Sequence, residues 1–176
     1  MELFFTSDQH YFHRNIMLYD QRPFGSVEEM NQVMIDRHNS VVSPNDEVYI
    51  IGDFSFGTKI QTETVLKQLR GKLFLIKGNH DKIMKKESIR SYFKWIRDYH
   101  EINLIKRKDL FLVLSHYPFA SWNRMHKGSI HLHGHTHETQ KITGQRRYNV
   151  SVVANDYKPV SLEDILQKIS PEKSET

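Results

Sequence analysis

Short apolar runs recur through the first half of the chain, and longer polar segments separate them. Three runs have the length and the β-branched and aromatic composition of buried strands, at residues 2–7, 47–51 and 72–77. In the segments between them, apolar residues recur as they do on one face of a helix. This strand–helix–strand–helix–strand order predicts a parallel sheet with right-handed crossover helices on its faces.

Capping patterns mark where the two crossover helices begin. Ser26 with Glu29, and Thr58 with Gln61, have the spacing of a capping box, in which each side chain satisfies the other residue's backbone N–H. A third helix is predicted at residues 87–95. These signals complete an α/β first half.

The second half of the chain has a different character. Residues 100–106, 110–114, 129–133 and 147–154 are mostly strand-like and have short connections. Ser161 then opens a final short helix. This change predicts a second sheet packed against the first.

The composition is that of one globular unit. A chain of 176 residues, 38% hydrophobic, favours a single domain over residues 1–170, followed by a polar tail at 171–176. The absence of cysteine excludes disulfides and thiolate metal sites and is consistent with a cytoplasmic location. No apolar run approaches the roughly 20 residues of a membrane helix, so we expect no membrane association.

The most distinctive residues follow directly after the apolar runs. Because ligands bind at the carboxyl ends of strands in open α/β sheets, residues distant in sequence can meet at one edge. The polar clusters at these positions are Asp8-Gln9-His10, Gly52-Asp53, Gly78-Asn79-His80-Asp81, His116 and Gly134-His135-Thr136-His137.

These clusters contain the side chains that two neighbouring divalent cations require. Imidazole and carboxylate ligands without sulfur suit zinc, manganese or iron(II). Asp8 and His10 lie two residues apart, so both side chains point the same way at a strand end. Gly78 and Gly134 allow close approach of the backbone. Each cluster alone is common by chance, but all five in this order predict a two-metal site.

With these five blocks, the chain resembles the calcineurin-like metallophosphoesterase superfamily, particularly its compact bacterial and phage-type members. The resemblance implies an α/β fold, a four-layer α/β/β/α sandwich with two facing mixed β-sheets. It also implies a hydrolase with two divalent metal ions (Mn, Fe or Zn). Its substrate would be a small phosphoester or nucleotide, either a phosphomonoester or a phosphodiester, attacked by a metal-bridging hydroxide. We expect a monomer or homodimer.

The same resemblance implies a role for each site residue. The implied ligands are Asp8, His10 and His137 for the first ion, Asn79, His116 and His135 for the second, and Asp53 between them. His80 is expected to donate a proton to the leaving oxygen, with Asp81 orienting its ring. His13, Arg14 and Asn15 are candidates for substrate contact; alternatively, they are solvated groups at a helix start.

Two other functions stay open at this stage. The net charge is +4, and basic residues gather at 82–90 and 106–108, so a nuclease acting on RNA or DNA ends is one alternative. The other is a non-catalytic metal-binding scaffold on the same fold. Because every expected ligand position is filled, the sequence favours the enzyme.

Overall fold

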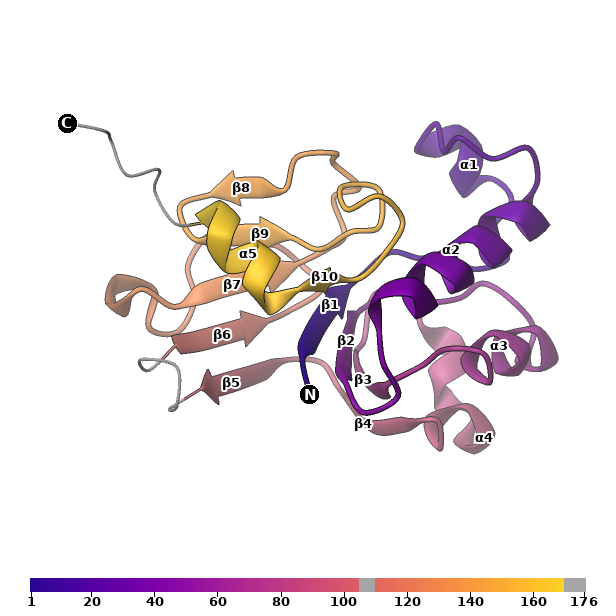
Figure 1. Cartoon of the computed structure of the whole chain (residues 1–176), viewed down its shortest axis with the longest axis horizontal. Helices are drawn as coiled ribbons and strands as arrows, with labels where there is room; N and C mark the ends of the chain where they lie inside the picture. Colours follow the sequence, from indigo (N-terminus) through magenta and orange to yellow (C-terminus); the bar gives the residue numbers. More distant parts are fainter. Residues whose placement is uncertain (105–109, 170–176) are drawn as a thin grey trace.

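The computed structural model describes residues 1–104 and 110–169. The predicted polar tail at 171–176, the end of the predicted strand at 100–106 and the basic run at 106–108 lie outside these residues. Within them, the chain forms two five-stranded sheets, with strand orders β10-β1-β2-β3-β4 and β5-β6-β7-β9-β8 (Figure 1).

The first sheet contains the predicted parallel half. Its strands are β1 (Leu3–Thr6), β2 (Glu47–Ile51), β3 (Lys72–Ile76), β4 (Phe93–Arg97) and β10 (Val160–Ser161). Strands β1 to β4 are parallel, and β10 pairs antiparallel with β1. The sequence did not predict β10, which has only two residues.

Helices cover one face of this sheet. They are α1 (Ile16–Tyr19), α2 (Val27–Val41), α3 (Lys59–Leu66), the 3-10 turn η1 (Lys82–Lys85) and α4 (Glu87–Arg90). Met30 and Met34 of α2 and Val65 of α3 are buried against the sheet. Both predicted helix starts are confirmed: Ser26 Oγ accepts from Glu29 N at 3.1 Å, and Thr58 forms a reciprocal capping box with Gln61. The predicted capping box at Ser26 is only half formed, because Glu29 Oε2 accepts from Gly25 N at 2.7 Å.

The predicted helix at 87–95 is wrong beyond Arg90, because the chain turns into β4 at Phe93. A β-bulge in β4 explains why the spacing of its apolar residues is not that of a regular strand. Leu73 pairs with Phe93, but Leu75 pairs with Ile96, so β4 contains one extra residue. The extra residue turns Trp95 to the opposite face from Phe93, where it contacts aromatic rings of the inter-sheet core.

The second sheet contains β5 (His100–Leu104), β6 (Leu110–Leu114), β7 (Ile130–His133), β8 (Ile142–Gly144) and β9 (Arg147–Asn149). The sequence did not predict β8. The predicted strand at 147–154 ends at Asn149 because the chain then crosses between the sheets. Val150 N donates to His133 O at 2.9 Å, and Val152 N donates to Ser7 O at 3.0 Å. This crossing joins the two sheets beside the carboxyl ends of β1 and β7.

The two sheets face each other across a shared apolar core. Phe5, Ile51 and Ile76 line it from the first sheet, and Leu114 and Leu132 line it from the second. Helix α5 (Leu162–Ile169) adds Leu162 and Ile165 to the same core, and Ser161 Oγ caps it by accepting from Asp164 N. The predicted α/β sandwich with two facing mixed sheets is confirmed. Among the described residues, no helix has the length and apolarity to cross a bilayer.

Candidate metal centre

The carboxyl ends of strands from both sheets meet at one edge of the sandwich. Asp8 N donates to Gly52 O at 3.0 Å, which joins the loops after β1 and β2. Gly134 N donates to His116 O at 3.1 Å, which joins those after β6 and β7. His135 N lies 3.2 Å from Asp8 Oδ1, so the two sheets also meet. Five strand ends, including that of β3, therefore supply the candidate ligands.

Two groups of side chains lie close enough to hold a metal ion. The groups are Asp8, His10 and His137, and Asp8, Asp53 and His116. Their ligand atoms lie within 4.8 Å of one another in each group. The first group is the one that the resemblance implies for the first ion. The second combines His116, implied for the second ion, with Asp53, implied to lie between the ions, and with Asp8.

The Asp53 carboxylate lies close to one histidine of each group, His10 and His116. Its Oδ2 atom is 3.6 Å from His10 Nε2 and 3.5 Å from His116 Nε2. Asp53 is nearly fully buried. Burial alone would raise the pKa of Asp53, but hydrogen bonding and attraction to His116 outweigh burial and lower it to about 2. An ionised carboxylate in this position suits a ligand shared by two cations.

The ring of His116 is oriented by the backbone. Its Nδ1 atom lies 2.9 Å from Ile51 O, so Nδ1–H is the donor of that hydrogen bond. Nε2 faces Asn79 Oδ1 at 3.1 Å and Asp53 Oδ2 at 3.5 Å. Burial alone would lower the pKa of His116, but hydrogen bonding to Asp53 and attraction to Asp8 outweigh burial and raise it, so Nε2 lies where a positive charge, either a proton or a cation, is stabilised. The His135 ring lies beside His116, with centroids 5.1 Å apart.

His10 supplies an independent test of whether a metal fits. Its Nε2 atom is buried and has no hydrogen-bond partner, and Asp53 Oδ2 at 3.6 Å is too distant to be one. Burial lowers the pKa of His10 to about 3, which leaves the imidazole neutral. Because buried polar atoms are normally paired, an orphaned neutral nitrogen beside two carboxylates fits a metal ligand.

Most candidate ligands have an unusual backbone conformation. Non-glycine residues rarely adopt positive φ, and strained backbones concentrate at functional sites. The φ angles of five of the seven candidate ligands lie between 52° and 72°, namely Asp8, His10, Asp53, His135 and His137. The chain therefore bends sharply after each strand, and this bend turns the side chains toward one another.

Two glycines pack directly against candidate ligands, as the sequence predicts. A Cβ atom on Gly78 would lie 2.2 Å from Asp53 Oδ1, and one on Gly134 would lie 2.3 Å from Asp8 Oδ2. Neither glycine has a positive φ. These positions need glycine because there is no space for a side chain.

His80 and Asp81 have different environments. His80 is exposed at the rim, where Phe56 contacts its ring at a centroid distance of 4.9 Å. We expected Asp81 to orient that ring. Instead, the buried Asp81 carboxylate accepts from the backbone N–H groups of Asp53, Phe54 and Gly78. Asp81 therefore holds the loops after β2 and β3 together, and it shows no contact with the His80 ring among the described residues.

Of the three candidate substrate contacts, the structure brings one to the centre. His13 Nδ1 lies 3.2 Å from His10 Nδ1, and the His13 ring stacks on Phe56 with centroids 4.0 Å apart. Arg14 and Asn15 are exposed at the start of α1. Their position also fits the alternative of solvated groups at a helix start.

The neighbouring histidines of β7 are structural. His133 contacts Gly134 O and Thr143 Oγ1 through its two ring nitrogens. His131 contacts Val113 O and accepts from Phe119 N. Because all four nitrogens already have protein partners, neither ring is available as a metal ligand.

Sequence reasoning missed two residues beside the centre. Asp20 accepts from His137 Nδ1 at 2.9 Å, and Arg22 donates to Asp20 Oδ2 at 2.8 Å. Burial alone would lower the pKa of His137, but its hydrogen bonds to Asp20 and Asp8 outweigh burial and raise it to about 9. Asp20 lies far from His137 in the sequence and outside any apolar pattern, so no local signal identifies this pair.

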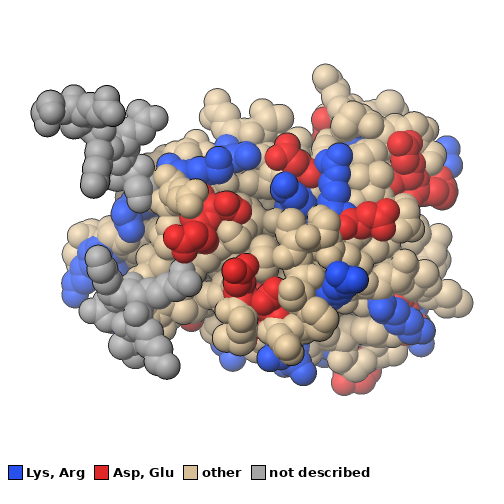
Figure 2. All heavy atoms as spheres, viewed as in Figure 1, with Lys and Arg blue, Asp and Glu red and all other residues tan. Residues whose placement is uncertain are grey.

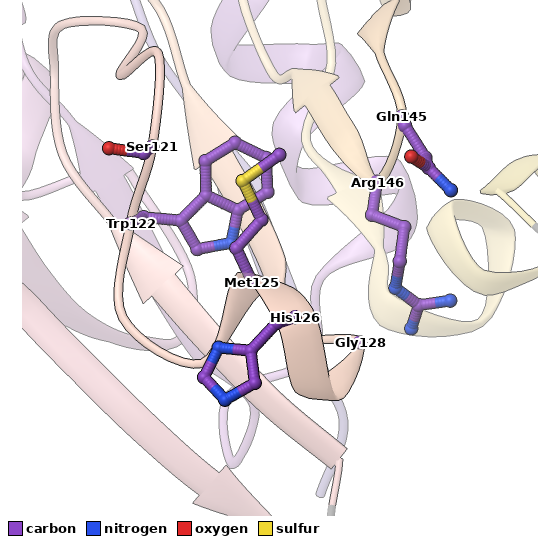
Figure 3. A pocket seen from close by; sticks show the side chains of 7 residues that line it. All are labelled: Ser121, Trp122, Met125, His126, Gly128, Gln145 and Arg146. Carbon is purple, nitrogen blue, oxygen red and sulfur yellow. The ribbon is translucent and has the colours of Figure 1, made fainter.

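A separate hollow of about 570 Å³ lies away from this centre (Figure 3). Its lining residues include Trp122, His126 and Arg146. Trp122 and His126 precede β7, and Arg146 precedes β9, whereas the candidate ligands His135 and His137 follow the carboxyl end of β7. The hollow is therefore at the opposite end of these parallel strands and contributes no residue to the metal centre.

Surface charge gives no separate indication of a nucleic-acid site on the face shown in Figure 2. There, the basic and acidic side chains of the described residues are interspersed rather than gathered in one basic band. A strand of nucleic acid is normally bound along such a band. This face therefore does not add support to the nuclease alternative.

The fold and the site together are those of an α/β sandwich with two facing mixed sheets and candidate metal ligands at its strand ends. The profile of the calcineurin-like phosphoesterase superfamily domain matches residues 1–155. The chain belongs to this superfamily.

The similar proteins cover between 76% and 98% of this chain. An uncharacterized protein of Methanocaldococcus jannaschii is 34% identical over 180 residues, which cover 98% of this chain and 93% of the relative. The gene 66 protein of Mycobacterium phage L5 is 28% identical over 158 residues, 76% of each chain. A crystal structure of a protein of unknown function from Aquifex aeolicus has a TM-score of 0.73 and 28% identity, covering 96% of this chain and 99% of that one.

Proposed function

We propose that this chain is a phosphoesterase that depends on two divalent metal ions and hydrolyses a small phosphoester or nucleotide. The observation that carries the proposal is the position of Asp53 Oδ2, 3.6 Å from His10 Nε2 and 3.5 Å from His116 Nε2. A carboxylate between two imidazoles, one of which has an unpartnered buried nitrogen, suits a pair of cations. Manganese, iron and zinc all match this ligand chemistry.

Each candidate ligand has a defined task in this proposal. His10 and His137, with Asp8, would hold one cation, while Asn79, His116 and His135 would hold the other. When bound, two such cations lower the pKa of a shared water and neutralise charge on the phosphoryl oxygens.

The remaining site residues act on the substrate or on the loops. The exposed His80 ring is positioned at the rim, and its backbone N–H donates to Asp53 Oδ1 at 2.8 Å. A histidine there can supply the proton that the leaving oxygen needs. His13 would contact the phosphoryl group or the substrate beside it. Asp81 acts indirectly, because it fixes the backbone of Asp53.

The test is hydrolysis by manganese-loaded protein. We expect activity on bis-p-nitrophenyl phosphate, p-nitrophenyl phosphate or both, and none from Asp53→Asn. A panel of mononucleotides, cyclic 2′,3′- and 3′,5′-nucleotides, dinucleotides and single-stranded RNA then distinguishes small substrates from nucleic acid. Metal binding without hydrolysis of any of these would favour the non-catalytic scaffold.

A further inference from the structure

Asp20 and Arg22 form a buried ion pair directly behind the candidate metal centre. Arg22 Nε and Nη2 lie 3.0 and 2.8 Å from Asp20 Oδ2. The Arg22 side chain has 0% exposure and that of Asp20 has 5%. A buried charge costs free energy unless it is paired and fully hydrogen-bonded. The burial of Arg22, in the loop between α1 and α2, therefore depends on the groups that its guanidinium contacts.

The other bonds of Arg22 go to the turn that presents two candidate ligands. Nη1 donates to Gln9 O at 2.8 Å, and Nη2 donates to Asp8 O at 2.9 Å. In this turn, Asp8 and His10 have positive φ angles of 57° and 52°. The left-handed region is unfavourable for residues other than glycine. The guanidinium holds the strained backbone in place by bonding two successive carbonyl groups.

Asp20 connects this arrangement to a ligand from the opposite sheet. Its Oδ1 and Oδ2 atoms lie 2.9 and 3.0 Å from His137 Nδ1. Because Nδ1–H donates to the carboxylate, Nε2 is the ring nitrogen that faces the centre, where Asp8 Oδ1 lies at 3.4 Å. A carboxylate behind a ligating histidine fixes its tautomer and ring orientation and raises its basicity.

We propose that Asp20 and Arg22 are positioning residues for one of the two cation positions, the one formed by Asp8, His10 and His137. The inference rests on the proposed function. The second position has its own support, since Ile51 O orients His116 at 2.9 Å. Loss of Asp20 should therefore weaken one position and leave the other intact.

The experiment is a calorimetric titration of the metal-stripped full chain with Mn²⁺. The wild-type protein should bind two equivalents. In Asp20→Asn, one equivalent should bind about 10–100-fold more weakly, and the other should change by less than about threefold. Asp98→Asn is the matched control, because Asp98 is 83% exposed and pairs only with Lys77 among the described residues. It should titrate like the wild type.

A second variant covers the case in which an unpaired Arg22 prevents folding. Asp20→Asn/Arg22→Gln removes both charges and should show the same selective loss, with native circular dichroism before metal is added. Equal weakening of both positions, or unchanged affinities, would overturn the inference alone. A wild-type protein that binds no Mn²⁺ would overturn the proposed function as well. Two bound equivalents without hydrolysis of any phosphoester would overturn only the proposed function.

Discussion

The Asp81 carboxylate accepts a hydrogen bond from the backbone N–H of Asp53, with 2.8 Å between Asp53 N and Asp81 Oδ2, so one acidic residue fixes the backbone conformation of another. Two further backbone N–H groups, of Phe54 and Gly78, donate to the same carboxylate. The loops after β2 and β3 are thereby locked together at the point where Asp53 enters the metal centre. Asp81 contributes to the site through backbone geometry rather than through contact with substrate.

Substitution of Asp81 tests this role. Asp81→Asn keeps the shape of the side chain but replaces one acceptor with an NH₂ group that faces backbone donors. We expect the free energy of unfolding to fall by about 1–3 kcal/mol, because a buried donor loses its partner. Urea unfolding of the metal-stripped protein measures the effect, with exposed Asp98→Asn as the control. Stability equal to that of the wild type would contradict the role.

Removal of the His80 side chain should separate rate from metal binding. His80→Ala is expected to keep the metal content of the wild type and to lose about 10²–10⁴-fold in kcat, the usual contribution of a general acid. Metal analysis of the purified variant, together with steady-state kinetics, provides both readouts. If the variant lost one metal equivalent, His80 would be a ligand and the proton-donor role would be wrong.

Gly134→Ala should disrupt the centre without altering any charge. The added Cβ would lie 2.3 Å from Asp8 Oδ2 and from Ser7 Oγ, so the Asp8 carboxylate must move. We expect weaker metal binding and lower stability, measured by Mn²⁺ titration and thermal unfolding. Gly25→Ala is the matched control, since its Cβ meets only the flexible end of Glu29 at 3.2 Å. Equal affinities in the two variants would refute the steric argument.

Stability should depend on pH through His38, far from the candidate ligands. Burial lowers the pKa of His38 from 6.5 to about 4, although its hydrogen bond to Arg70 O opposes the shift. The unfolded chain then takes up a proton that the folded chain does not. The folded state therefore has its full stability above pH 6.5, and its free energy of unfolding decreases as the pH falls toward 4.

The loss amounts to roughly 3 kcal/mol, at 1.36 kcal/mol per pKa unit. Urea unfolding at pH 7 and pH 4.5 should show a smaller difference for His38→Gln, which keeps an N–H donor, than for the wild type. His131, whose pKa burial also lowers to about 4, contributes separately and is unchanged in that comparison. An identical pH dependence in both proteins would show that folding does not lower the pKa of His38.

The sequence by itself determined the parallel half of the fold and the membership of the candidate site. Apolar runs locate β1, β2 and β3, and the helices between them make these strands parallel, which places their carboxyl ends at one edge. Asp8 and Asp53 could therefore be assigned to one edge before any contact was known, whereas His116 was added by its position after an apolar run and by the resemblance. These features depend on local periodicity and chain chirality, which a sequence states directly.

Tertiary structure decided the features that depend on single hydrogen bonds between distant segments. The β4 bulge, the crossing at Val150 and the contact between Asp20 and His137 have no local pattern. The backbone N–H groups that donate to Asp81 likewise depend on how the loops after β2 and β3 pack. A polar side chain can satisfy its hydrogen bonds in many ways, and only the packed chain selects one of them.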